Sequence, residues 1–88
     1  MKLVRTERFK KKFKNFPEHI KELAIKKFDL LLSNPHHPSL RVKKVKGIVE
    51  GFRDAFEASI TMNYRFLFRI EDDSYILLTC GTHDELFK

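Results

Sequence analysis

The chain has 88 residues, of which 42% are hydrophobic and nine are phenylalanine, and its formal net charge is +6. A chain of this length buries only about 60–65% of its unfolded surface, so we expect one domain, residues 1–88, around a small core. The single cysteine, Cys80, excludes an internal disulfide and indicates a reducing compartment, where we expect a buried, unreactive thiol. No segment approaches the roughly 20 apolar residues of a membrane span, so we predict a cytoplasmic protein without a membrane partner.

The positive charge is concentrated in the first half of the chain. Residues 1–47 contain 14 Lys and Arg against 4 Asp and Glu, a balance of +10, whereas residues 48–88 contain 4 against 8, a balance of −4. A half this basic indicates a polyanionic partner, either nucleic acid or an acidic protein segment. For the run Lys10–Lys12, a solvated helix surface is the alternative interpretation.

The first half of the chain predicts a short strand followed by two helices. After a strand over residues 2–5, Thr6 is a suitable N-cap for a helix that ends at Pro17. The second helix covers residues 17–33 and ends before Pro35, because the residue before a proline avoids the helical region. Apolar residues at helical spacing mark the buried stripes of the two helices: Phe9, Phe13 and Phe16 in the first, and Ile20, Leu23, Ala24, Phe28 and Leu31 in the second.

In the second half the apolar period changes from helical to alternating, which predicts strands. We expect a strand from Leu40 to near Gly47 and another that begins after Gly51. The clearest strand covers residues 62–70, and after a turn at residues 71–74 the apolar run 75–80 predicts a last strand in the sheet interior. The expected fold is α+β: an N-terminal strand and a helical hairpin packed on one face of a small antiparallel sheet.

Strand alternation also predicts which face carries function. Tyr64, Phe66 and Phe68 should face the helices, so Arg65 and Arg69 should lie on the opposite face. An arginine in the middle of a strand suits a phosphate group, which it binds through two parallel hydrogen bonds. A surface arginine paired with Glu57 or Asp54 is the alternative.

The last eight residues predict the chemistry. His83 and Phe87 follow the final strand and Gly81. Histidine exchanges protons near neutral pH, because its ordinary pKa is about 6.5, and an aromatic ring is a usual surface for stacking an unpaired base. With Arg65 and the lysines at positions 43, 44 and 46, this combination predicts a small RNA-cleaving site.

Strand alternation would place Lys44 and Lys46 on one face and Lys43 with Val45 on the other. We expect no metal site and no small-molecule cofactor. His36 and His37 lack Cys or acidic companions at ligand spacing, and the chain has neither a glycine-rich phosphate loop nor a recognisable Ser or Cys nucleophile setting.

Three segments in this order resemble the RelE/ParE toxin superfamily of bacterial and archaeal toxin–antitoxin systems, and the last two are most similar to the YafQ-type mRNA interferases. The segments are Gly47-x-x-x-Gly51-Phe52-Arg53-Asp54-Ala55, Asn63-Tyr64-Arg65-Phe66-x-Phe68 and Gly81-Thr82-His83-Asp84-Glu85-Leu86-Phe87. Where YafQ-like relatives place histidines, this chain has lysine near position 43 and Phe56. RelE-like relatives have a basic cluster in this region, so the resemblance implies that the lysines at positions 43, 44 and 46 replace the first histidine.

The resemblance implies a toxin that cleaves mRNA in the ribosomal A site without a metal ion, through attack of the ribose 2′-hydroxyl on the adjacent phosphorus. It implies the ribosome, mRNA and a cognate antitoxin as partners. His83 would be the general acid or base, Arg65 would hold the phosphate, Phe87 would orient the base, and Lys43 or Lys46 would supply charge or a second proton transfer; the identity of the general base stays open. Further RNA contacts are assigned to Lys44, Arg41, Arg53, Arg69, Lys10, Lys11 and Lys12. The alternatives are a non-enzymatic ParE-like inhibitor of DNA gyrase and an RNA-binding relative that has lost activity.

Overall fold

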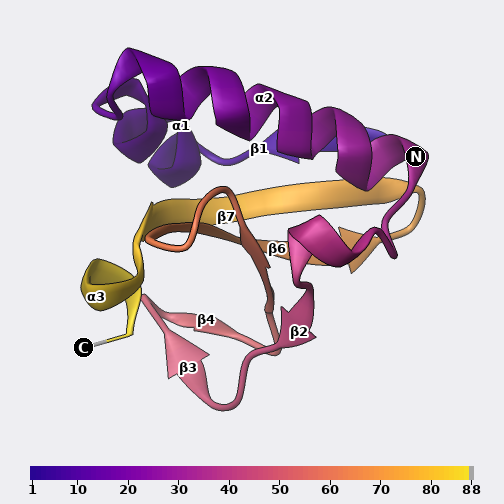
Figure 1. Ribbon diagram of the computed structural model, residues 1–88. Coiled ribbons are helices and arrows are strands. Elements are labelled where there is room, and N and C mark those ends of the chain that lie inside the picture. The colour runs from indigo at the N-terminus through magenta and orange to yellow at the C-terminus, as the bar shows by residue number, and fades with distance from the viewer. Residues whose placement is uncertain (88) are drawn as a thin grey trace.

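The computed structural model describes residues 1–87, and Lys88, the last residue of the predicted tail, lies outside this range. Two helices cover one face of a five-stranded sheet, while a small β-hairpin and a one-turn helix lie on its other side (Figure 1). The elements in chain order are β1 (Lys2–Arg5), α1 (Glu7–Lys14), α2 (Glu18–Ser33), the 3₁₀ turn η1 (Pro38–Leu40), β2 (Lys43–Lys44), β3 (Ile48–Val49), β4 (Phe52–Arg53), β5 (Phe56–Ser59), β6 (Tyr64–Glu71), β7 (Ser74–Thr82) and α3 (His83–Leu86).

The five strands of the main sheet lie in the order β1-β7-β6-β5-β2, and β3 pairs with β4 in a separate two-stranded sheet. The predicted α+β class is confirmed, and β7 lies inside the sheet as expected. One pairing differs from the prediction, because β1 runs parallel to β7 while the other neighbours are antiparallel. The sheet is therefore mixed. A parallel pair needs a long connection between its strands, and here that connection contains both helices.

Both predicted helices form, but α1 ends at Lys14 and not at Pro17 as predicted. The Thr6 hydroxyl oxygen accepts a hydrogen bond from the Phe9 backbone N–H (3.1 Å) and donates one to the Leu78 carbonyl (2.8 Å), which joins the start of α1 to β7. Pro17 precedes α2, and Asn34 ends it. Four of the five residues predicted on the buried stripe of α2 are buried, whereas Leu23 is exposed, so its assignment to that stripe was wrong.

The main core lies between the helices and the sheet and is built largely from aromatic rings. Phe28 of α2 contacts Phe66 of β6 edge-on, with ring centroids 5.2 Å apart, and Phe68 meets Tyr75 of β7 in the same way at 5.6 Å. Phe66 and Phe68 belong to this core, while Leu67 between them is buried on the other face. The predicted alternation of β6 is therefore confirmed, and Arg65 and Arg69 share the face of Leu67. Cys80 is buried in the same core, as predicted, and burial raises the pKa of its thiol to about 12.

A second, smaller core covers part of the face that the sequence left open. Leu67 and Leu78 pack there against Val49 of the hairpin and Leu86 of α3. The predicted strand from Leu40 to Gly47 is wrong in extent: Leu40 is buried in η1, and only β2 pairs with β5. The residues after it turn back as the hairpin β3–β4, in which Glu50 and Gly51 both have positive φ, as a two-residue type I′ turn requires. Within residues 1–87, no helix is both long enough and apolar enough to cross a bilayer.

Candidate functional site

A cleft of about 380 Å³ opens between strand β2, with the residues that follow it, and helix α3. Its walls contain three lysines, one carboxylate, one imidazole and one phenyl ring. The lining residues are Lys43, Lys44, Val45, Lys46, Glu57, His83 and Phe87. Five residues that the sequence assigned to catalysis or RNA binding therefore lie around one hollow, although β2 and α3 are far apart in the chain.

The hydrogen bonds at the end of β7 position His83 and Phe87. The Thr82 hydroxyl accepts a hydrogen bond from the Glu85 backbone N–H (3.2 Å), while the Glu85 carboxylate accepts one from the Thr82 N–H (2.8 Å), which is a capping box. The His83 N–H donates to the Asn63 carbonyl at 2.7 Å, and this bond ties α3 to the loop before β6. One turn later the Phe87 ring lies 5.0 Å from the His83 ring, centroid to centroid. The His83 side chain is 48% exposed, so a ligand in the cleft can contact it.

Glu57 is a buried carboxylate that joins the cleft to Arg65. It is only 2% exposed, and its strand position places it directly across from Lys43. Its two oxygens lie 2.7 Å from Nη1 of Arg65 and 3.6 Å from Nζ of Lys43. The ion pair between Arg65 and Glu57, which was the alternative interpretation of Arg65, is therefore present.

Arg65 does not line the cleft, but it forms an ion pair with Glu57, which does. Its Nε and Nη2 both donate to the Met62 carbonyl, at 3.1 and 2.7 Å, and its Nη1 donates to Glu57. A guanidinium has five N–H donors, so these three bonds leave two donors for another acceptor. The side chain is 15% exposed, and its orientation is fixed from two sides.

The three lysines enter the cleft from both sides of the short strand. Lys43 faces Glu57, and Lys44 is paired with Phe56 on the neighbouring strand. Val45 then packs against the second core, and its N–H donates to the Ala55 carbonyl at 2.9 Å. The alternation predicted Lys43 and Val45 on one face and Lys44 and Lys46 on the other, yet all four residues contribute to the walls of the cleft, because β2 has only two residues and the chain turns directly after it.

The other predicted RNA-binding residues lie outside the cleft. Lys10 and Lys11 are exposed on α1, and Arg41 lies after η1, near a different hollow. Arg69 is at the far half of β6, where its Nη2 donates to the Arg53 carbonyl at 2.8 Å. Contacts between these residues and RNA stay predictions.

Lys12 has a structural partner that the sequence did not reveal. Its Nζ lies 2.6 Å from the Glu50 carboxylate, which also accepts a hydrogen bond from the Thr79 hydroxyl at 2.6 Å. Burial alone would raise the pKa of Glu50, but the hydrogen bonds from Lys12 and Thr79 and the charges of Lys12 and Arg8 lower it overall. Arg8 also donates to the Glu50 carbonyl and lies over the Phe52 ring. Glu50 thus fastens the hairpin β3–β4 to α1.

Glu57 is the site residue that sequence reasoning missed, since it was considered only as a possible partner of Arg65. Its position inside a strand, between Phe56 and Ala58, was the available signal, because a carboxylate there is either exposed or paired. No group of three or more His, Cys, Asp or Glu side chains suitable for a metal ion occurs in the part of the chain described here, and His37 instead accepts a hydrogen bond from the Ser39 N–H at 3.1 Å.

These features define a small basic α+β protein with a lysine-lined cleft that contains a histidine and an aromatic ring. Neither a protein-family model nor a curated protein matches the chain. Solved structures do match it. YafQ from E. coli strain BL21(DE3) has a TM-score of 0.79 at 16% identity, over 98% of this chain and 97% of that one. YafQ within the E. coli DinJ–YafQ toxin–antitoxin complex has a TM-score of 0.77 at 16% identity, over 98% and 96%.

Two further matches come from other organisms. A copper-bound mutant toxin from Helicobacter pylori has a TM-score of 0.70 at 26% identity, over 99% of both chains. The archaeal RelE–RelB complex from Pyrococcus horikoshii OT3 has a TM-score of 0.73 at 18% identity, over 92% of both chains. The chain therefore has the fold of the YafQ and RelE toxin structures, as the resemblance of its three segments predicts.

Proposed function

We propose that residues 1–88 form one toxin domain of a toxin–antitoxin pair, and that this toxin is a ribosome-dependent endoribonuclease that cleaves mRNA in the A site. The observation that carries the proposal is the cleft itself. Lysines from the middle of the chain and His83 with Phe87 from its end meet around one hollow, beside an arginine held in place by a buried carboxylate. This combination serves an RNA phosphate better than it serves a simple docking surface.

The proposed reaction breaks the RNA chain by internal transesterification. The ribose 2′-oxygen attacks the adjacent phosphorus, the bond from phosphorus to the 5′-oxygen of the next nucleotide breaks, and the products are a 2′,3′-cyclic phosphate and a 5′-hydroxyl. One protein group accepts the proton of the 2′-hydroxyl, and another donates a proton to the leaving 5′-oxygen. No metal ion enters this reaction as we propose it.

The residues of the cleft supply both proton transfers. A neutral imidazole accepts a proton at neutral pH, so we assign the 2′-hydroxyl proton to His83. A lysine ammonium is a donor and not an acceptor, so Lys43 or Lys46 donates to the leaving oxygen. The remaining lysine charge stabilises the negative charge that develops on the phosphorane oxygens.

Arg65, Glu57 and Phe87 orient the substrate in this proposal. The two N–H donors of Arg65 that Met62 and Glu57 leave unused bind oxygens of the scissile phosphate. Glu57 fixes the direction of Arg65 and Lys43 and is a positioning residue. Phe87 stacks on a base next to the cleavage point, and its ring also packs against the second core, which limits its movement.

The proposed partners are the ribosome with its mRNA and an antitoxin. The E. coli YafQ structure of the same fold forms a toxin–antitoxin complex with DinJ. The charge balance of +10 in residues 1–47 suits an acidic antitoxin segment as well as RNA. We expect the antitoxin to reach the lysines at positions 43, 44 and 46, so that binding of antitoxin and of mRNA exclude one another.

Primer extension in a translating extract tests the proposal. Wild-type protein should create new 5′ ends in a reporter mRNA that keep step with its codons, and His83→Ala should create none while still binding the ribosome. Lys26→Ala, an exposed lysine on α2 outside the cleft, is the matched control and should cleave like wild type. Growth arrest without cleavage by any variant would favour an inhibitor of DNA gyrase, and a supercoiling assay would follow.

A further inference from the structure

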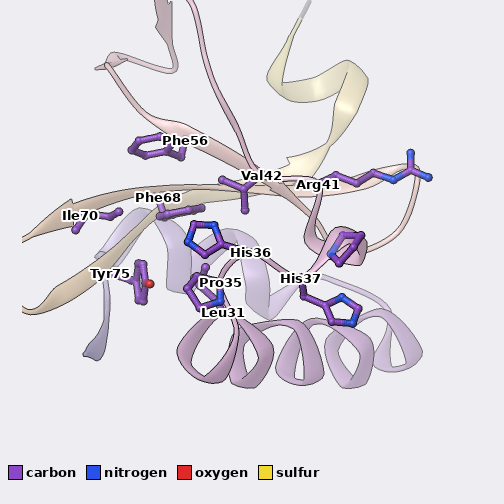
Figure 2. A pocket seen from close by; sticks show the side chains of 11 residues that line it. Leu31, Pro35, His36, His37, Arg41, Val42, Phe56, Phe68, Ile70 and Tyr75 are labelled. Carbon is purple, nitrogen blue, oxygen red and sulfur yellow. The ribbon is translucent and has the colours of Figure 1, made fainter.

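A second hollow lies on the helix-covered side of the sheet, away from the cleft. It measures about 490 Å³ and opens between the end of α2, the segment 35–42 and the adjoining parts of β5, β6 and β7 (Figure 2). Its volume falls within the range of ligand pockets, about 300–1,000 Å³. The walls that matter for a ligand come from His36, Val42, Phe56, Phe68, Ile70 and Tyr75.

Aromatic rings dominate these walls. The rings of Phe56 and Phe68 stack with centroids 5.5 Å apart and planes inclined by 23°, and Phe68 meets the Tyr75 ring edge-on. Figure 2 shows these three rings and the His36 imidazole around the hollow, with Val42 above it. Such a surface suits a flat ring, which can stack on an aromatic side chain whatever its identity.

Two polar groups of this pocket lack a partner. The Tyr75 hydroxyl and the imidazole of the exposed residue His36 make no hydrogen bond within residues 1–87, and both can reach solvent in the pocket. Tyr75 and His36 both lie at the wall of the pocket, together with Leu31 (Figure 2). A purely apolar occupant would leave both groups unpaired, which is unfavourable. A planar ligand with hydrogen-bonding atoms on its edge would satisfy them.

The rim of the pocket carries one fixed positive charge, that of Arg41. None of the residues that line the pocket is acidic, and Arg41 and His37 lie at its rim, with their side chains extending away from the hollow (Figure 2). Acidic residues directly follow two of the lining residues, but Glu57, after Phe56, lines the cleft, and Glu71, after Ile70, pairs with Arg69. Aromatic walls, two free hydrogen-bonding groups and a cationic rim together match a base attached to a phosphate.

The pocket and the cleft share the two strands at one edge of the sheet. In β5, Phe56 faces the pocket and Glu57 faces the cleft; across from them in β2 lie Lys44 and Lys43, respectively. Because β2 is the edge strand, an RNA strand that leaves the cleft can pass around it, with these exposed lysines along the way.

From this arrangement we infer that the pocket binds an unpaired nucleobase of the RNA, next to the segment held in the cleft. The inference rests on the proposed function, because it takes RNA as the substrate. The base stacks against the aromatic wall, and its edge exchanges hydrogen bonds with the Tyr75 hydroxyl and the His36 imidazole. Its phosphate lies outside the hollow, on the side toward which Arg41 extends.

Nuclear magnetic resonance titration of the nitrogen-15-labelled full chain tests the inference without any cleavage. The probes are adenosine, adenosine 5′-monophosphate and inorganic phosphate at millimolar concentration. The nucleotide should shift the amide signals of Val42, Ile70 and Tyr75, and adenosine should do the same more weakly. Phosphate alone should leave these signals in place.

Variants make the test specific. Tyr75→Phe removes one hydrogen bond and should weaken nucleotide binding roughly three- to tenfold. Val42→Glu and Ile70→Glu place a carboxylate at the exposed wall and should abolish binding, while Ile25→Glu, at an exposed apolar position of α2 outside the pocket, should not. His83→Ala should also bind normally, which separates this pocket from the cleft.

Three results would overturn the inference: shifts confined to the cleft residues, equal shifts with inorganic phosphate, or equal loss of binding in Ile25→Glu. Loss of antitoxin binding in Val42→Glu, with no response to the nucleotide in the wild type, would assign the pocket to a protein partner instead. Cleavage of mRNA by wild type without nucleotide binding would refute the pocket alone and leave the proposed function standing.

Discussion

Replacing Glu57 by glutamine should destabilise the protein and misdirect Arg65, because this carboxylate is the buried link between the sheet and the cleft. Glutamine keeps the size of the side chain and one carbonyl oxygen, so no cavity forms. What is lost is the charge that accepts the 2.7 Å hydrogen bond from Arg65. A hydrogen bond to a charged group contributes about 1.5–3 kcal/mol.

The expected loss for Glu57→Gln is near the middle of that range, about 2 kcal/mol, for two structural reasons. Arg65 is mostly buried and would retain its bonds to the Met62 carbonyl, so its charge is only partly left without a partner. The pair with Lys43 adds little, because that lysine is 65% exposed and the distance is 3.6 Å. An exposed ion pair of this kind contributes about 0–1 kcal/mol.

Urea unfolding followed by circular dichroism measures these changes, with Lys43→Met as the matched variant that removes only the exposed partner. Glu57→Gln should lose about 2 kcal/mol and Lys43→Met less than about 1 kcal/mol. Combining Glu57→Gln with Arg65→Met should cost less than the sum of the two single changes, because the double variant leaves no buried charge unpaired. A loss below about 0.5 kcal/mol for Glu57→Gln, or equal losses for the two single variants, would refute the role given to this ion pair.

Three further predictions concern chemistry, core and pH. His83→Ala should change the free energy of unfolding by less than about 0.5 kcal/mol, since the side chain is half exposed, but it should abolish cleavage. The neighbouring change Asp84→Ala should keep the activity within a few-fold of wild type. A large loss of stability in His83→Ala would show that His83 is structural. Phe28→Ala should lower the free energy of unfolding in urea by about 3–5 kcal/mol, because it leaves a cavity in the aromatic core. Leu23→Ala, at an exposed position of the same helix, should lower it by less than about 1 kcal/mol. Similar values for the two variants would show that the buried face of α2 is assigned wrongly. The folded-state pKa of Glu50 lies below its ordinary value of 4.5, so the stability it contributes is present above pH 4.5 and is lost as pH falls through the lowered pKa. The melting temperatures of wild type and Glu50→Gln should therefore differ at pH 7, and the difference should shrink as the solution is acidified below pH 4.5. A constant difference would exclude this linkage.

The parts of the fold that follow from local patterns could be predicted. The spacing of apolar residues, the Thr6 cap and two prolines predict the two helices, and all of these signals act within a few residues. In the long strand β6, successive side chains alternate between the two faces of the sheet without interruption near its start. This alternation predicted Arg65 on the face opposite Phe66. These features need no knowledge of distant partners.

The segment from Leu40 to Arg53 could not be predicted in detail, because its conformation depends on tertiary contacts. Leu40 lies in a stretch where apolar and polar residues alternate, as in a strand. In the structure it is buried, but it belongs to a 3₁₀ turn. The hairpin that follows is held by Glu50, whose partners Lys12 and Thr79 lie in distant parts of the chain. The parallel pairing of β1 with β7 is likewise set by residues at opposite ends of the sequence.

The same division holds for the candidate site. His83, Phe87 and the lysines were predicted from their residue types and from the resemblance of three segments that follow one another along the chain. The fold brings these residues to one cleft. Glu57 was missed because its importance comes from its ion pairs with Lys43 and Arg65 on the two neighbouring strands, which no local pattern encodes. Lys12 was assigned to RNA for its charge alone, and its ion pair with Glu50 is again a tertiary contact.

The most direct test of the proposed function is to identify the products made on programmed ribosomes by wild type and by His83→Ala. Mass spectrometry of a short labelled mRNA, cut in a single turnover, reads the new 3′ end. The proposed function predicts a 2′,3′-cyclic phosphate that is formed by wild type and is absent with His83→Ala. A 3′-hydroxyl end, or the same cyclic product at the same rate from both proteins, would contradict it.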